Sequence, residues 1–428
     1  MKCWVFVFNP LERYMANYKQ IFDAWEEGGV RGIVVGRMFF MKDGDITVPA
    51  FPQDPAVYVK LGLDTPESEL RDVVKEKTLS GMLDDAKKRG WHIMVFNSGT
   101  TAQVQSLVNR YPQVDGVIID GPGENHYELA FHHGGKLFQT LEHERREWSE
   151  QGYDVARIEN GIRHLRGQFH NLTPEKVRYH AEGGMLAGLN LFDFDEDALY
   201  WWRARQNRSL RSWQDARATL DRCDRYVELG GIPRITSWSS LTGQNYQQMP
   251  LYFDYIFPKH YYWHRGFDGL YGTVERWVRK FCEWNPSLSE ADGFLLMKSL
   301  FGLELPGVTS LYDLEMGFPD AFFTQTVYNE TKRALEAIRD INKAIFWVST
   351  GRYPHAGDPM SARDLEGILR ATQEAGAERF LFHPDPDPGP SEWSIISHIC
   401  GTPWRQSPQG YWPPDARKPD EYLRDGDT

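Results

Sequence analysis

The chain has 428 residues, of which 41% are hydrophobic and 25% are charged, as is typical of a globular protein. Its formal net charge of -12 argues against a nucleic-acid partner, because binding to phosphates requires a basic surface. No apolar run approaches the roughly 18 residues that a membrane-spanning helix needs, so no membrane partner is expected either.

The first 120 residues alternate between apolar runs and helical patterns. Runs rich in Val, Ile and Phe predict strands at 3–8, 31–40, 91–99 and 114–120. The stretches between them predict helices at 12–27, about 67–89 and 100–111. Because the apolar runs are continuous rather than alternating, they favour strands that are buried on both faces of a parallel sheet.

The segment from about 140 to 229 breaks this alternation, since its pattern is mostly helical. About 90 residues is far longer than a usual crossover between strands. We therefore expect a helical insertion at about 136–230. Its composition does not decide between a lid over a site and an interface between copies of the chain.

The alternation resumes after the insertion, with strands predicted at 233–240, 253–263, 343–350 and 378–385. Eight strands alternating with helices predict a (β/α)8 TIM barrel with a long helical insertion after strand 4. A doubly wound open sheet is the alternative, but no glycine fingerprint follows the first strand. We expect one barrel domain over residues 1–405, followed by an irregular Pro-rich tail at 406–428.

The carboxyl ends of barrel strands carry the catalytic groups in this architecture. Asp120 ends the fourth predicted strand, and Gly121-Pro122-Gly123 then turns the chain so that Glu124 folds back toward it. Such a turn brings two carboxylates within the roughly 5 to 9.5 Å that glycoside hydrolysis uses. We predict Asp120 and Glu124 as the catalytic pair. The alternative is a turn-initiating Asp beside a solvated Glu.

The other predicted strand ends and the loops that follow them carry cationic, polar or aromatic side chains. Cations beside aromatic rings suit a hydroxyl-rich or anionic sugar, although the same residues also occur in packed loops. The predicted substrate-binding residues are Arg37, Asn97, Trp238, Lys259, His260, Tyr261, Trp263, Arg352, His355, His383, Glu392 and Trp393. The weaker catalytic candidates are Asp268 in a turn, Glu304 at a helix end and Asp358 at a helix cap.

Signals for cofactors and metals are weak. The chain has no HExxH motif, no cysteine cluster and no dinucleotide or phosphate motif, so we predict neither a cofactor nor a bound metal. One alternative stays open, because His260, His355, His383 and Asp120 lie on different strand ends and could converge on an ion. That arrangement would favour a metal-dependent sugar isomerase, epimerase or hydrolase.

The stretches "GVIIDGPGE" at the fourth strand and "DYIFPKHYYW" at the sixth, with aromatic-rich strand ends, resemble the (β/α)8-barrel glycoside hydrolases. Several clans of that group place a catalytic carboxylate at the end of strand four, where Asp120 stands. The resemblance implies hydrolysis of glycosidic bonds in a small-molecule or oligosaccharide substrate. The chain lacks an Asn-Glu pair at strand four and a glutamate at strand seven, which departs from one large clan. A carbohydrate-binding barrel without catalysis is a further alternative.

The compartment follows only indirectly from the sequence. Four widely spaced cysteines form no CxxC pair, which suits a reducing compartment, and the first ten residues turn polar too early for a secretory signal. We therefore expect a cytoplasmic protein. A signal peptide removed from a precursor would leave the same first residues, so a secreted or periplasmic location stays open.

Overall fold

The computed structural model describes most of the chain. The described residues are 1–7, 10–36, 38–42, 46–64, 66–67, 70–96, 99–130, 135–262, 269–349, 362–383 and 390–403. The predicted tail at 406–428 lies outside them.

A nine-stranded parallel sheet forms the centre of the molecule, in the order β8-β7-β6-β5-β2-β1-β11-β10-β9. Its strands are β1 (Lys2–Val7), β2 (Val30–Val35), β5 (His92–Phe96), β6 (Gly116–Asp120), β7 (Glu228–Ile232), β8 (Tyr255–Ile256), β9 (Lys259–His260), β10 (Phe346–Ser349) and β11 (Arg379–His383). A separate antiparallel pair comprises β3 (Phe39–Lys42) and β4 (Ile46–Pro49).

The sheet curls, and its two outermost strands come from one stretch of chain. Only Phe257 and Pro258 separate β8 from β9. β8 pairs with β7, β9 pairs with β10, and Ile256 forms a parallel bridge with Ala344. The fold is therefore an α/β fold with a curled parallel sheet, and it is TIM-barrel-like.

The two faces of the sheet pack differently because side chains alternate along each strand. Ile118 and its counterparts on the inner face form one buried cluster with Trp4, Phe6, Val34, Met94, Ile232, Phe257, Tyr261, Ile345, Trp347 and Leu381. The alternate residues, such as Val117 and Phe346, join the much larger core between the sheet and the helices. Large apolar side chains thus fill the inner face of the sheet. The polar side chains of the strands lie at the ends of the strands.

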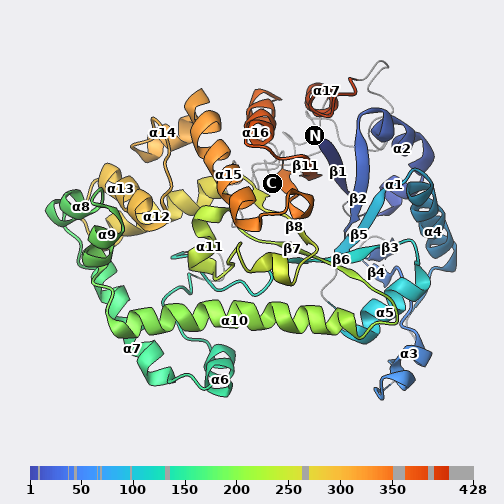
Figure 1. Cartoon of the computed structure of the whole chain (residues 1–428), viewed down its shortest axis with the longest axis horizontal. Coiled ribbons are helices and arrows are strands. Elements are labelled where there is room, and N and C mark those ends of the chain that lie inside the picture. The colour runs from blue at the N-terminus through green and yellow to red at the C-terminus, as the bar shows by residue number, and fades with distance from the viewer. Residues whose placement is uncertain are drawn as a thin grey trace.

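Helices surround the sheet (Figure 1), and none of those in the described residues is long and apolar enough to cross a membrane. Before β7 they are α1 (Glu12–Met15), α2 (Tyr18–Glu27), α3 (Pro55–Lys60), α4 (Val73–Lys88), α5 (Thr101–Arg110), α6 (Glu142–Glu150), α7 (Val155–Phe169), α8 (Pro174–His180), α9 (Gly184–Phe192) and α10 (Glu196–Asp221). After β7 they are α11 (Thr236–Thr242), α12 (Leu270–Trp284), α13 (Glu290–Phe301), α14 (Leu311–Met316), α15 (Tyr328–Ile338), α16 (Ala362–Glu374) and α17 (Pro390–Ile399).

The helices α6 to α10 lie between β6 and β7 in the chain. Figure 1 shows α10 running across the molecule, with α6 and α7 on its outer side and α5 near one end. Asp195 caps α10 by accepting a hydrogen bond from the backbone N–H of Ala198, at 2.7 Å. This long helix packs along α7, and in the chain it links α9 to β7.

The predicted strand at 233–240 is wrong, since the chain forms β7 at Glu228–Ile232 and the helix α11 over most of that stretch. β7 was not predicted because it contains two glycines, and glycine has a low propensity for strands. Their packing explains the strand. A Cβ at Gly230 would come within 2.8 Å of Ile118 and Phe257, and one at Gly231 within 2.7 Å of Phe253. Only glycine fits between these side chains.

The crossing of α7 over α10 also depends on a glycine. A Cβ at Gly161 would lie 2.3 Å from the backbone oxygen of Asp197, and backbone atoms have little room to move. We expect Gly161→Ala to lower the free energy of unfolding by about 2 kcal/mol, because overpacking outweighs the better helix propensity of alanine.

Gly167→Ala is the matched control, since it lies on the same helix with nothing within 4 Å of its added Cβ. It should leave the melting temperature equal or higher. Thermal unfolding of both variants checks the prediction, and equal melting temperatures for the two would contradict it.

Candidate functional site

The strands of a parallel sheet end at the same edge, so their last residues come together. Asp120 is confirmed as the last residue of β6, and His383 is the last residue of β11. Arg234 follows β7 by two residues, Lys259 begins β9, and Tyr261 follows β9. We call Asp120, Arg234, Lys259, Tyr261 and His383 the rim cluster.

An ion pair lies at the centre of the rim cluster. The Nζ of Lys259 is 2.7 Å from Oδ1 of Asp120, and the side chains are 3% and 41% exposed respectively. Asp120 is thus the accessible partner, and Lys259 is the buried one. Lys259 also lies 5.8 Å from the centre of the Tyr261 ring, close enough for a cation–π interaction.

Both members of the pair have shifted pKa values. Burial lowers the pKa of Lys259 to about 8, and the charge of Arg234 adds to this shift, while Asp120 opposes it. Desolvation by the surrounding protein would raise the pKa of Asp120, but the charges of Lys259 and Arg234 outweigh it and lower that pKa below its usual value. Near neutral pH the pair therefore consists of a carboxylate and an ammonium, and this ammonium loses its proton at a lower pH than that of an ordinary lysine.

Glu124 is held by Arg234. The guanidinium Nε donates to Oε2 at 2.8 Å and Nη2 donates to Oε1 at 3.0 Å, and the glutamate side chain is only 9% exposed. The turn before it uses Gly121 and Gly123, whose φ angles of 53° and 63° suit glycine. Both carboxylate oxygens of Glu124 thus already accept hydrogen bonds from a buried cation.

Arg234 is not among the predicted site residues, because the strand predicted at 233–240 made it an interior strand residue. Its pKa responds to burial, which lowers it, but the charge of Glu124 prevails and raises it. Its guanidinium also lies 5.4 Å from the centre of the Tyr127 ring. A Pro-Arg pair directly after two glycines and an isoleucine is the signal of a strand end that could have located it.

The polar residues that follow the turn anchor the loop. Asn125 donates from Nδ2 to the hydroxyl of Ser209 at 2.9 Å and to the backbone oxygen of Thr242 at 2.9 Å. Glu128 is 1% exposed and accepts a hydrogen bond from Nε of Arg276 at 3.1 Å. Burial raises the pKa of Glu128, and this arginine opposes the shift. The loop is thus fixed against α10, α11 and α12, which in turn positions Asp120 and Glu124.

His383 belongs to an aromatic wall beside the ion pair. Its ring lies 4.9 Å from that of Phe6, 5.7 Å from that of Trp347 and 6.0 Å from that of Tyr261. Burial lowers the pKa of His383 to about 3, and the charge of Lys259 contributes to the shift. The imidazole of His383 is therefore an uncharged ring near pH 7.

Several predicted substrate-binding residues lie elsewhere. His260 faces the helices, 4.7 Å from the ring of Phe346, and burial lowers its pKa to about 3. Trp238 packs 4.4 Å from Phe301, and Trp393 packs within the core between sheet and helices. Glu392 lies half-buried in the first turn of α17. The structure does not bring these four residues to the rim cluster.

Other predicted site residues lie outside the described residues, and the structure does not place them. They are Arg37, Asn97, Trp263, Asp268, Arg352, His355 and Asp358. Within the described ranges, no group of three or more His, Cys, Asp and Glu side chains could hold a metal ion.

With this geometry, the structure resembles TIM-barrel glycoside hydrolases at low sequence identity. The glycoside hydrolase domain of PgaB (BpsB) from Bordetella bronchiseptica is 10% identical with a TM-score of 0.42, covering 95% of this chain and 99% of that one. A β-galactosidase from the psychrophilic Marinomonas ef1 is 12% identical with a TM-score of 0.41, covering 94% of this chain but only 59% of that one. A β-mannanase from the blue mussel Mytilus edulis is 10% identical with a TM-score of 0.33, covering 94% and 90%.

Sequence comparison adds no relative, since no protein-family model and no curated protein matches the chain. The TM-scores above lie below 0.5, so these likenesses carry no argument about reaction or substrate.

Proposed function

We propose that the protein is a carbohydrate-active enzyme that hydrolyses glycosidic bonds at the rim cluster. The observation that carries the proposal is the ion pair of Asp120 with the buried Lys259 at the carboxyl edge of the sheet. A carboxylate that is kept ionised, is exposed to solvent and pairs with a lysine lying near the Tyr261 ring suits attack at, or stabilisation of, a positively charged sugar carbon.

The proposal includes a finer description of the fold. We propose a (β/α)8 barrel in which β8 and β9 are two parts of one sixth strand. The helices between β6 and β7 then form an insertion after the fourth strand, within a single catalytic domain at residues 1–405. In such a barrel the carboxyl edge is the end at which active sites are found.

Each member of the site has a proposed role. Asp120 acts as the nucleophile or as the base that activates water, and Lys259 keeps it ionised and binds a sugar hydroxyl. The departing oxygen takes its proton from water as the glycosidic bond breaks. Tyr261 and the neutral His383 contact the sugar ring. Glu124 was predicted as the second catalytic carboxylate, but its bidentate pair with Arg234 suits a positioning residue better. It holds the guanidinium whose charge acts on Asp120.

The metal-dependent alternative has less support. His260, one of its predicted ligands, packs against Phe346 and Tyr262 on the outer side of its strand. A set of His260, His383 and Asp120 would require the backbone of β9 to turn over. The proposed chemistry therefore uses no metal.

A panel of fluorogenic aryl glycosides and unlabelled oligosaccharides tests the proposal, with release of fluorophore or new reducing ends as the measurement. We expect turnover of at least one substrate that increases with enzyme concentration. Saturable binding of a glycan without any cleavage would instead establish a carbohydrate-binding barrel.

A second candidate function is catalysis through an imine that Lys259 forms with a carbonyl substrate. A buried amine with a pKa of about 8 is a better nucleophile near neutral pH than an ordinary lysine. Its addition to a substrate carbonyl, with loss of one water molecule, would give an imine. Asp120 would accept the proton that the amine nitrogen loses and return it to the departing water. Sodium borohydride with pyruvate or glyceraldehyde should then attach a stable adduct to Lys259, detectable by peptide mass spectrometry. An unmodified Lys259 peptide would exclude this function for those carbonyl compounds.

A further inference from the structure

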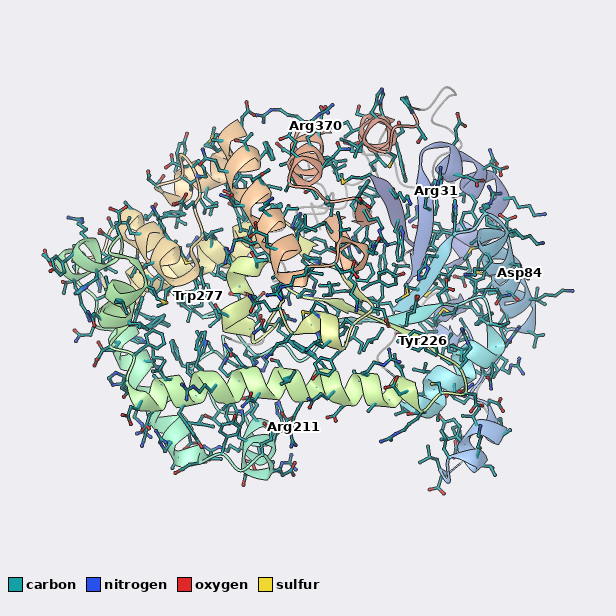
Figure 2. All side chains as sticks on the ribbon, viewed as in Figure 1. Arg31, Asp84, Arg211, Tyr226, Trp277 and Arg370 are labelled. Carbon is teal, nitrogen blue, oxygen red and sulfur yellow. The ribbon has the colours of Figure 1, made fainter. Side chains whose placement is uncertain are left out.

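A large cavity lies apart from the rim cluster. Its volume is about 870 Å3, and its lining comes from α7, α9 and α10 on one side and from α11, α12, α13 and α15 on the other. No member of the rim cluster contributes to this lining. Trp277, which does, lies on the side of the molecule away from β1 and β2 in Figure 2. The volume falls within the range of small-molecule binding sites.

The walls of the cavity are mainly aromatic and aliphatic. Phe169 packs 4.8 Å from the ring of Phe192 and 6.2 Å from that of Trp277, and all three line the cavity. These rings are held in place by their packing in the core between sheet and helices. The site is therefore preformed, and a ligand would bury apolar surface without reorganising it.

The helix α9 exposes apolar side chains beside the cavity. Its sequence, GMLAGLNLF, is apolar except for Asn190, a pattern typical of a helix that is covered on most of its faces. Leu191 and Phe192 point into the core, but Met185 is 78% exposed and Leu189 is 36% exposed, and both line the cavity. A bound molecule would cover the face of α9 that the protein leaves uncovered.

The charged groups of the lining carry both signs, with Lys298, Lys332 and Arg333 opposite Glu182, Glu304, Glu330 and Glu336. Lys298 lies 3.3 Å from Glu304 and 3.8 Å from Glu182. Arg333 lies 3.3 Å from Glu330, which is 4% exposed and also accepts a hydrogen bond from the backbone N–H of Ser237 at 3.1 Å. Neither sign of charge dominates the cavity. A charged ligand would lose hydration here and would meet repelling as well as attracting charges.

The uncharged polar groups of the lining include Ser299 on α13 and Asn329 on α15. A hydroxyl or amide oxygen of a ligand could hydrogen-bond to them at the edge of the apolar walls. We propose that this cavity binds an uncharged amphiphile, with its hydrocarbon part among the aromatic rings and its polar end at Ser299 and Asn329. The inference is independent of the function proposed for the rim cluster.

Titration with N-phenyl-1-naphthylamine, an uncharged apolar fluorophore, tests the proposal on the full chain. We expect saturable enhancement of its fluorescence at a single site. Displacement then compares three ten-carbon compounds that differ only in the charge of the polar end, namely decanol, decanoate and decylamine. Decanol should displace the probe at a concentration at least tenfold lower than either ion.

Two variants of α9 locate the binding. Leu189→Trp fills part of the cavity and should weaken probe binding at least tenfold. Leu186→Trp is the matched control, because Leu186 is 71% exposed on the same helix and does not line the cavity, so its affinity should stay within about twofold. Gly188→Leu, which also projects into the cavity, repeats the test if the first variant fails to fold.

Three results would overturn the inference: an absence of saturable binding, equal weakening by both tryptophan variants, or displacement by an ion as effective as displacement by decanol. Asp120→Asn should leave probe binding unchanged. Failure of the glycosidase proposal therefore does not affect this experiment.

Discussion

Replacing Asp120 by Asn is expected to reduce turnover of a glycosidic substrate by roughly 10³-fold or more, with little change in substrate binding. The amide keeps the shape of the side chain but lacks the negative charge, and so it is too weak a nucleophile and base to attack a sugar carbon or deprotonate water. Steady-state kinetics on the best substrate of the glycoside panel measures the loss.

The fold should survive this substitution. Lys259 is 3% exposed, so the loss of its counter-ion would normally leave a buried charge. However, the pKa of Lys259 is about 8, and its deprotonation at pH 7 costs only about 1.4 kcal/mol. The lysine can therefore become neutral in the variant. We expect the free energy of unfolding to fall by no more than about 2 kcal/mol.

Asp115→Asn is the matched control. Asp115 precedes the other end of the same strand and is also paired with a lysine, with 2.8 Å between its Oδ1 and Nζ of Lys87. Turnover of this variant should stay within about twofold of the wild type. Wild-type turnover in Asp120→Asn would remove the proposed role, and equal losses in both variants would point to the stability of the sheet instead.

Turnover is also expected to depend strongly on pH and to fall at alkaline pH. Burial lowers the pKa of Lys259 to about 8, so the ammonium is present below that pH and is lost as the pH rises through it. If the ammonium binds the sugar and balances the charge of Asp120, kcat/KM should fall tenfold per pH unit above about pH 8.

Variants of Lys259 distinguish this explanation from general loss of stability at high pH. Lys259→Arg keeps a positive charge at every accessible pH, so the decrease near pH 8 should disappear, whereas Lys259→Met should be poorly active throughout. Lys87→Arg, at the opposite end of the sheet, should keep the wild-type profile. A decrease near pH 8 that persists in Lys259→Arg would show that another group titrates. If the larger arginine side chain does not fit, Lys259→Met serves as the second variant, because it has no group that titrates at this position and should show no decrease near pH 8 in its residual activity.

The strands and the position of Asp120 could be predicted from the sequence because their signals are local. A continuous apolar run that ends at Asp120 and is followed by Gly-Pro-Gly specifies a buried strand and a turn whatever surrounds it. The same reasoning failed at β7. Its two glycines have low strand propensity, and only the side chains of Ile118, Phe253 and Phe257 explain why glycine is required there.

The composition of the site was decided by tertiary structure. Glu124 pairs with Arg234, 110 residues away, and Asp120 pairs with Lys259, which lies on a strand that is not its neighbour in the sheet. No local pattern shows which strand ends face each other across a curled sheet. Side-chain direction adds to the difficulty, because neighbouring residues of a strand point to opposite faces. Lys259 therefore joins the rim cluster while His260, the next residue, is buried against the helices, a difference that only the register of β9 beside β10 determines.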